Sequence, residues 1–237
     1  MKTLIQSLWI GPRLSVMEHL SISSYLAHGH AYHLYVYDEV DNLPAGLVLR
    51  DANEILPASM IFQYSQYKSY AGFANFFRYQ LLLERGGWWV DTDTVCLKPF
   101  AFADDYVFAR EQLEDREVVT NGTIKAPPGS EILAEACRIC RAKNPEELHW
   151  GETGPRLLGE LVDQFGFEAS VQPAAAFCPI AYNAWEGVLD PAVEWTFEPA
   201  THAVHLWNEM WRRAGKDKEQ SYPSDCLYER LKRRYLG

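Results

Sequence analysis

The sequence predicts an α/β fold with a central, mostly parallel β-sheet, and three observations predict it. Residues 3–9 and 31–37 are apolar and aromatic runs typical of strands, and residues 13–28 between them carry leucine and methionine at near-helical spacing. A strand, a helix and a strand in this order form a βαβ unit, whose two strands run parallel. Residues 73–100 then contain a second helical pattern, a stop at Gly86-Gly87 and another apolar run.

Length and composition favour one globular domain over residues 1–237. The chain is 48% hydrophobic and 23% charged, which is ordinary for a globular domain with a sizeable core. Its net charge of −10 disfavours non-specific binding of nucleic acid, so we expect no nucleic-acid partner. The odd number of cysteines, five, and the lack of a leader-like start indicate reduced thiols in a cytoplasmic protein.

The remaining elements are expected in order along the chain. Residues 47–49 predict a short strand, and 61–70 predict a lid or a cleft wall. The second half predicts strands at 105–110, 117–120, 123–125 and 202–207, and helices at 130–142 (capped by Ser130), 154–165 and 224–236. Asn121-Gly122 is a strong turn signal and predicts a hairpin turn after 117–120.

The C-terminal region is basic although the chain is acidic. Residues 209–237 carry eight basic and five acidic side chains. The helix around 224–236 is amphipathic, with Ser224 as its predicted N-cap. Its basic face is either exposed to solvent or makes a peripheral contact with an anionic membrane. In a cytoplasmic protein, that contact would be with the inner face of the membrane.

Two aspartates follow the central apolar run directly. Trp88, Trp89 and Val90 predict a short buried strand, and Asp91 and Asp93 come next. On extended backbone the residues i and i+2 point the same way, so the two carboxylates are expected to share a face. Like charges at that separation repel each other, and a divalent cation relieves the repulsion. The pattern predicts a metal site, and carboxylate oxygens suit Mg²⁺ or Mn²⁺.

The aspartates alone leave three interpretations open. In the first, the cation stabilises a leaving nucleoside diphosphate as Lewis acid and template. In the second, D-x-D-x-T after an apolar strand resembles the first motif of haloacid-dehalogenase-like phosphatases, with Asp91 as nucleophile. In the third, the aspartates lie in a solvated turn, since a bare DxD motif is a weak signal.

A longer pattern resembles a known family. The run RYQLLLERGGWWVDTDTVCLKP, residues 78–99, resembles the RYxxLxxxGGxYxDxDxxxxxP signature of DxD glycosyltransferases of the initiation-mannosyltransferase and α-1,4-galactosyltransferase type. This type is glycosyltransferase family 32-like and related to the catalytic core of large glucosylating toxins. Leu8-Trp9-Ile10-Gly11 resembles the N-terminal WIG segment of the family, and His205-x-Trp207-x-x-x-Trp211 resembles its C-terminal HxWxxxW segment. The resemblance implies a GT-A-like, Rossmann-type nucleotide-sugar-binding fold.

The resemblance also implies roles for the residues that match. Trp9 would stack on the nucleotide base, with Ile10 beside it, and Arg78 would contact the donor sugar and the phosphate. Asp91 would contact the ribose, the sugar or the metal, and Asp93 would be the direct metal ligand. Arg78, Asp91 and Asp93 are thus the predicted catalytic residues.

Other matched positions concern the donor sugar and the diphosphate. Asn75 stands where the family usually has an aspartate that bonds a donor-sugar hydroxyl, so donor choice is expected to depend on it; Asn121 resembles a family asparagine that also binds the sugar. His205 is a predicted metal ligand or diphosphate contact, and Trp207 and Trp211 are predicted to close over the diphosphate. Gly154-Pro155 resembles a turn that shapes the acceptor cleft.

The sequence therefore predicts a metal-dependent, retaining glycosyltransferase. The expected donor is a nucleotide-diphosphate sugar, a UDP-sugar by preference, and the expected acceptor is a glycan or a lipid-linked sugar in bacterial surface-polysaccharide synthesis. No general base or nucleophile is predicted. The alternatives are the phosphatase and a non-catalytic sugar-nucleotide-binding module, for which the loss of a carboxylate at Asn75 is the argument.

Overall fold

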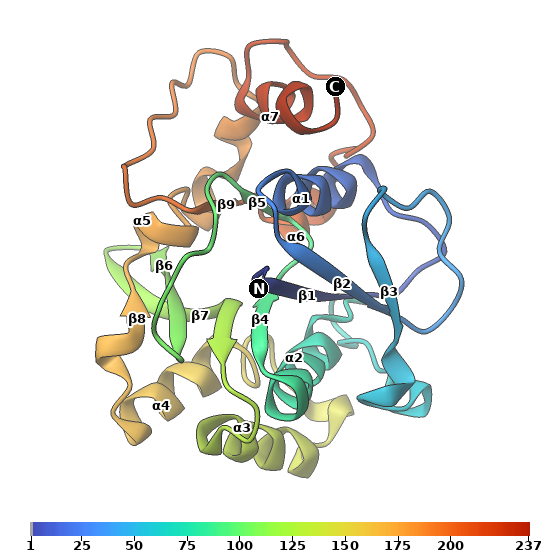
Figure 1. Ribbon diagram of the computed structural model, residues 1–237, viewed down its shortest axis with the longest axis vertical. Helices are drawn as coiled ribbons and strands as arrows, with labels where there is room; N and C mark the ends of the chain where they lie inside the picture. The colour runs from blue at the N-terminus through green and yellow to red at the C-terminus, as the bar shows by residue number, and fades with distance from the viewer. Residues whose placement is uncertain (1) are drawn as a thin grey trace.

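The computed structural model describes residues 2–237 and is built around one seven-stranded β-sheet (Figure 1). The strand order is β3-β2-β1-β4-β7-β6-β8. These strands are β1 (Leu4–Trp9), β2 (Ala31–Val36), β3 (Val48–Asp51), β4 (Gly87–Val90), β6 (Val107–Leu113), β7 (Arg116–Ala126) and β8 (Val171–Gln172). Strand β7 is antiparallel to both β4 and β6, and the other neighbouring strands pair in parallel. The predicted mostly parallel sheet is confirmed.

The predicted βαβ unit forms one half of this sheet. Helix α1 (Val16–Ala27) connects the parallel strands β1 and β2. A capping box fixes the start of α1: the Ser15 hydroxyl accepts a hydrogen bond from the Met17 N–H, and the Glu18 carboxylate accepts one from the Ser15 N–H. The unit places Trp9 at the carboxyl end of β1, which is the edge where ligands bind in α/β sheets.

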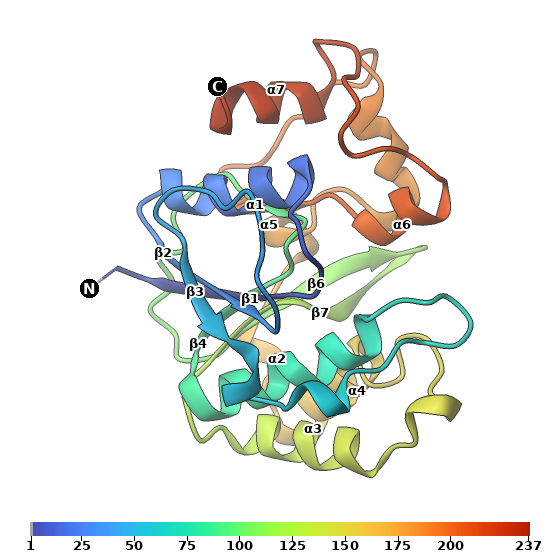
Figure 2. The same ribbon diagram turned by 90° about the vertical axis from the view of Figure 1, so that its right-hand side faces the viewer.

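Helices cover both faces of the sheet (Figure 2). One face carries α2 (Ala71–Arg85), α3 (Glu131–Ala142) and α4 (Pro155–Phe165), and the other carries α1, α5 (Ala174–Phe177) and α7 (Leu227–Tyr235). Trp88 packs against Phe100 on the α1 side, whereas Trp89 packs near Phe77 of α2. A strand that is buried on both faces needs apolar side chains at successive positions, which explains the apolar run before Asp91.

A second, two-stranded sheet joins two distant parts of the chain. Strand β5 (Thr94–Cys96) is antiparallel to β9 (Ala203–His205), with Thr94 opposite His205. Helix α6 (Asn208–Arg213) follows β9. The sequence predicted β9 from the alternation of residues 202–207, but β5 and α6 show no such pattern and were not predicted. The pairing brings the C-terminal segment beside the two aspartates.

The predicted hairpin turn at Asn121-Gly122 is wrong. Both residues lie inside the long strand β7, and the chain reverses before β7 instead, where Glu114 has a φ of 55°. The pairing of β6 with β7 shifts at Asn121-Gly122, since Phe108 is opposite Ile124 but Ala109 is opposite Thr120. An Asn-Gly pair tolerates the irregular backbone of a bulge as readily as that of a turn.

The ends of three helices agree only in part with the predictions. Helix α7 begins after Cys226, so Ser224 is not its N-cap. Ser130 is the N-cap residue of α3, as predicted, although its hydroxyl makes no capping hydrogen bond. Gly86 ends α2 with φ 63° and ψ −167°, a conformation open to glycine but not the left-handed helical one.

Short 3₁₀ turns complete the chain, at Ala52–Glu54, Ala58–Met60, Pro145–Glu147, Glu168–Ser170 and Tyr182–Leu189. Within residues 2–237, no helix combines the length and the apolar character that crossing a membrane requires.

Candidate active site

The two aspartates lie in a tight turn between β4 and β5. The Thr94 N–H donates to the Asp91 carbonyl at 3.0 Å, which closes a β-turn over Asp91-Thr92-Asp93. The expectation of extended backbone at this point is therefore wrong. The turn is held from both sides, because the Asp91 N–H donates to the Gly122 carbonyl and the Leu206 N–H donates to the Asp93 carbonyl, each at 2.9 Å.

Asp93 is buried and bound by the C-terminal segment. Its Oδ2 atom lies 3.1 Å from His205 Nε2 and accepts the Asn208 N–H at 2.7 Å. Burial raises the pKa of Asp93, but His205 and the Asn208 N–H together lower it by more. The pKa of Asp93 is therefore below its ordinary value. Burial lowers the pKa of His205, yet Asp93 outweighs burial and raises that pKa well above its usual range. The two side chains form a buried ion pair.

Asp91 is held by a different set of partners. Arg78 Nη1 lies 2.9 Å from Asp91 Oδ1, and the Trp89 indole N–H donates to the same oxygen at 3.0 Å. The Arg78 guanidinium lies over the Trp89 ring at 4.7 Å and also donates to the carbonyls of Ala74 and Asn121. Burial raises the pKa of Asp91, Arg78 opposes this, and the nearby charge of Asp93 adds to the increase.

Asp91, Asp93 and His205 are grouped closely enough to hold one metal ion. One ligand atom from each lies within 4.8 Å of the others. Two carboxylates and an imidazole suit Mn²⁺ or Mg²⁺. Gly122 leaves the necessary room, since a Cβ atom there would stand 3.1 Å from Asp91 Oδ2 and 3.8 Å from His205 Cε1. The residues present therefore fit a divalent cation.

The predicted sugar contacts form a second cluster at the start of α2. The Asn121 amide donates to Asn75 Oδ1 at 2.8 Å and to the Tyr79 hydroxyl at 3.2 Å, and that hydroxyl donates to the Gly154 carbonyl. A Cβ atom at Gly154 would stand 2.8 Å from Asn75 Nδ2. The structure thus brings Asn75, Asn121 and Gly154 together, next to Arg78.

The predicted tryptophans occupy unequal positions. Trp9 is half-buried, and its indole N–H is buried without a hydrogen-bond partner. Trp207 packs on the His205 ring at 4.0 Å and has a φ of 60°. Trp211 is fully buried and donates to the Leu206 carbonyl, so its side chain lies in the core and does not reach the cleft. Ile10 packs against the α2-side core.

Several residues near the site were not predicted from the sequence. Glu111 on β6 is one, because burial raises its pKa to about 7 despite the opposing charge of His205. The buried Cys178 is another, since its thiol contributes to the raised pKa of His205. The start of α6 is another, since Asn208 binds Asp93 through its backbone. Each contact depends on strand pairing or on a backbone atom, neither of which leaves a local sequence signal.

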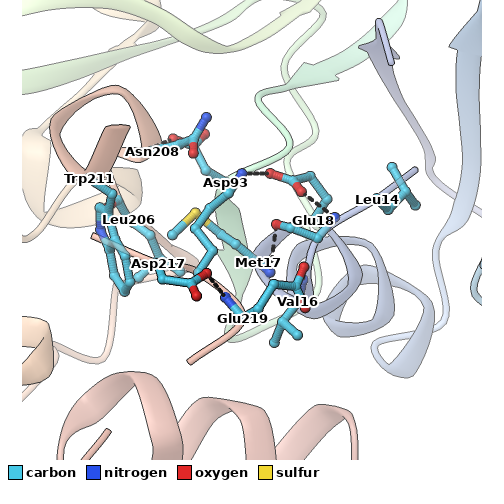
Figure 3. A network of polar contacts seen from close by, with 12 residues as sticks. Leu14, Val16, Met17, Glu18, Asp93, Leu206, Asn208, Trp211, Asp217 and Glu219 are labelled. Atoms are coloured by element: carbon cyan, nitrogen blue, oxygen red, sulfur yellow. Dashed lines mark hydrogen bonds and ion pairs between the residues drawn. The ribbon is translucent and has the colours of Figure 1, made fainter. Parts of the chain in front are cut away.

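A further polar network ties residues 217–219 to α1 (Figure 3). Lys218 Nζ lies 2.6 Å from the fully buried Glu18, and the Val16 N–H donates to Glu219 at 3.2 Å. Lys218 Nζ also lies over the Trp9 ring at 6.0 Å. Lys218 belongs to the basic region predicted from sequence, yet its charge is paired inside the fold. The network holds residues 217–219 over the start of α1, next to the segment that contains Asn208.

Comparisons with known proteins agree with this geometry. The model of the family described as glycosyltransferase sugar-binding region containing DXD motif matches residues 19–117, which include α2, β4 and both aspartates. This match covers less than half of the chain, and it supports the glycosyltransferase that the sequence motifs predict over the phosphatase. No curated protein matches the chain in sequence.

Solved structures with the same fold are distant in sequence. The PaToxG glycosyltransferase is 15% identical with a TM-score of 0.50, over 100% of this chain and 86% of that one. The galactosyltransferase LgtC, solved with donor and acceptor sugar analogs, is 10% identical with a TM-score of 0.48, over 97% and 94% of the two chains. GlyE of Streptococcus pneumoniae TIGR4 is 13% identical with a TM-score of 0.45, over 99% and 64%. The similarity to PaToxG concerns the fold, and the predicted GT-A-like class is confirmed.

Proposed function

We propose that this chain is a metal-dependent, retaining glycosyltransferase that moves a sugar from a nucleotide-diphosphate sugar to a glycan or lipid-linked acceptor. One observation carries the proposal: Asp91, Asp93 and His205 converge within 4.8 Å, and Arg78 is fixed beside them. Two carboxylates, an imidazole and a guanidinium at the carboxyl end of a parallel strand suit a cation and a diphosphate. We infer a UDP-sugar as the preferred donor.

Asp93, Asp91 and His205 would hold the Mn²⁺ or Mg²⁺ ion. Bound there, the ion would neutralise the charge that develops on the leaving nucleoside diphosphate. Arg78 would support the same charge, since its guanidinium is held by Ala74 and Asn121 and needs little reorganisation. His205 and Trp207 would line the diphosphate position. Trp211 would act through the core by supporting Leu206.

Trp9 would bind the nucleotide base, with Ile10 beside it. Its position at the carboxyl end of β1, next to β4, supports this role. Asn75 and Asn121 would bind hydroxyls of the donor sugar. Their side chains already hydrogen-bond each other at 2.8 Å, so the sugar would meet a fixed pair of amides. The family's carboxylate is replaced at Asn75, and donor choice would depend on this replacement.

The cellular setting belongs to the same proposal. We place one catalytic domain over residues 1–237 in bacterial surface-polysaccharide synthesis, acting in the cytoplasm. Arg230, Arg233 and Arg234 are exposed on α7, which supports a peripheral contact with the anionic inner face of a membrane.

The test is a binding and hydrolysis survey on the purified chain. Melting temperature is measured with each of a panel of nucleotide sugars, with and without Mn²⁺, and hydrolysis of each is followed by release of the nucleoside diphosphate. One donor is expected to raise the melting temperature only with Mn²⁺ and to be hydrolysed slowly without an acceptor. A panel in which no nucleotide sugar binds or reacts would refute the function. Binding without any turnover, with acceptors also present, would instead favour a non-catalytic module.

A further inference from the structure

The exposed large hydrophobic side chains among residues 2–237 fall into three groups. Leu43, Val48 and Leu49 lie at or before the edge strand β3, and Leu236 lies at the end of the chain. The third group consists of Met60, Tyr70 and Trp150. This group differs because its segments lead into the active site: Tyr70 directly precedes α2, which carries Arg78, and residue 150 shortly precedes Gly154, which contacts Asn75.

Trp150 is part of an aromatic corner, which we define as Tyr64, Tyr67, Trp150 and Arg213. The Tyr64 and Trp150 rings are 5.2 Å apart, and the Tyr67 ring meets Trp150 edge-on at 5.4 Å. The Arg213 guanidinium lies 4.1 Å from the Tyr67 ring and 4.6 Å from the Trp150 ring. Trp150 remains 38% exposed, so part of the indole faces solvent.

Helix α6 connects the aromatic corner to Asp93. Arg212 donates to the Tyr67 carbonyl at 2.8 Å, and Glu209 binds both Arg212 and Arg213. The same helix begins at Asn208, whose N–H bonds Asp93. With a rise of about 1.5 Å per residue, Arg213 lies about 8 Å along the helix from Asn208. Figure 2 shows α6 and the segments around residues 61–70 and 143–153 on the same side of the molecule.

This arrangement has the chemistry of a sugar-binding surface. The faces and edges of aromatic rings pack well against the C–H groups of a pyranose, and planar guanidinium and carboxylate groups hydrogen-bond its hydroxyls. A lipid chain would need a long apolar groove, but the segment beside Trp150 is polar and exposed, with Lys143, Glu146, Glu147 and His149. Glycosyl transfer also needs an acceptor hydroxyl close to the donor, and α6 connects the aromatic corner to Asp93.

We propose that the aromatic corner binds the pyranose ring of a glycan acceptor, with Trp150 as its main contact. The inference rests on the proposed glycosyltransferase function and adds the class of acceptor and the residues that bind it. Arg213 and Glu209 supply hydrogen bonds to hydroxyl groups. Tyr67 and Tyr64 support the Trp150 ring from the side.

The first experiment separates acceptor binding from donor chemistry. Transfer is measured with the donor that the wild-type enzyme hydrolyses and a panel of lactose, maltose, cellobiose and methyl hexopyranosides as acceptors. Trp150→Ala is expected to raise the acceptor KM about tenfold, as for other aromatic contacts at the centre of a binding surface. Donor hydrolysis without acceptor should stay at the wild-type rate. Leu49→Ala is the matched control, because Leu49 is 40% exposed and lies on β3.

The second experiment observes the contact directly and does not depend on turnover. The chain is labelled with 5-fluorotryptophan, and Trp150→Phe identifies the ¹⁹F signal of Trp150 among the eight tryptophans. Saturating acceptor sugar should shift this signal, and the shift should be the same in the Leu49→Ala control. Arg213→Ala is expected to weaken the shift, and circular dichroism verifies that each variant is folded.

The outcomes distinguish the inference from the function on which it rests. Unchanged acceptor KM in Trp150→Ala together with no shift of the Trp150 signal would overturn the inference, while metal-dependent donor hydrolysis would leave the function standing. An unglycosylated peptide that shifts the Trp150 signal where no sugar does would overturn the glycan class. A Trp150 shift with sugar in a chain that neither binds nor hydrolyses any nucleotide sugar would support the sugar contact and refute the transferase.

Discussion

The DxD turn, residues 91–93, and the C-terminal segment, residues 203–213, meet at the metal site but are built differently. The turn follows directly from a strand that is buried on both faces, and its contacts with Trp89 and Arg78 come from within the same stretch of chain. The C-terminal segment reaches Asp93 through a three-residue strand, one imidazole and two backbone N–H groups. The charge of Asp91 is thus balanced locally by Arg78, whereas the charge of Asp93 is balanced by His205, which is far away in the sequence.

This contrast predicts that Asp93 is the least replaceable residue of the site. Asp93→Ala removes the carboxylate that both segments share, and it leaves His205 buried without its partner. Metal-dependent donor binding should be abolished, and hydrolysis should fall by about 100-fold or more. Calorimetry with Mn²⁺ and nucleotide sugar measures the first effect. Asp104→Ala, in the exposed segment before β6, is the control, and unchanged donor affinity in Asp93→Ala would contradict the assignment.

Substitution of His205 tests the contribution of the distant segment alone. His205→Gln keeps a hydrogen-bonding group but removes the imidazole, so Mn²⁺ affinity should fall by about 10–100-fold with β9 intact. His202→Gln provides the comparison, because His202 bonds the Pro99 carbonyl on the other side of the strand. If both variants bind Mn²⁺ as tightly as the wild type, His205 is not a metal ligand and the C-terminal segment has only a structural role.

Substitution of Gly122 tests whether the space between the two segments is needed. Gly122→Ala places a methyl group 3.1 Å from Asp91 Oδ2, so Asp91 or His205 must shift. We expect the free energy of unfolding to fall by about 1–3 kcal/mol and Mn²⁺ binding to weaken. Gly159→Ala in α4 is the matched control, since its nearest neighbour is 3.7 Å away and alanine favours a helix by up to about 1 kcal/mol. Chemical denaturation of both variants measures the difference.

The smallest expected effect concerns Glu111 and pH. The folded protein raises the Glu111 pKa from its ordinary 4.5 to about 7, so it binds more protons than the unfolded chain between these values. The free energy of unfolding should therefore fall as pH rises from about 4.5 to 7. Glu111→Gln removes this pH dependence of the free energy of unfolding. The variant should be more stable than the wild type by about 2 kcal/mol at pH 8, with little difference at pH 4.

Denaturation of the metal-free protein at both pH values measures this difference, because a bound cation would itself favour the ionised carboxylate. A stability difference that does not change with pH would show that Glu111 titrates normally.

Much of the fold was readable from local patterns. The βαβ unit, the α2 helix with its glycine stop, and the strand before Asp91 all follow from hydrophobic period and helix-ending residues, and all are present. Asn121-Gly122 shows the limit of such patterns. The same two residues suit a turn or a bulge, and the choice depends on β7 pairing with β4 as well as with β6.

By itself, the sequence predicted the class of enzyme and the charged residues that the structure brings together. Arg78, the two glycines and the two aspartates lie close together along the chain, so their pattern can be recognised without knowing the fold. Tertiary structure alone decided how that charge is balanced. His205, the Asn208 N–H, the space left by Gly122 and the burial of Glu111 depend on which strands pair. It also decided that Trp211 lies in the core while Trp150 faces solvent beside Arg213, because burial is a property of packed neighbours and not of residue type.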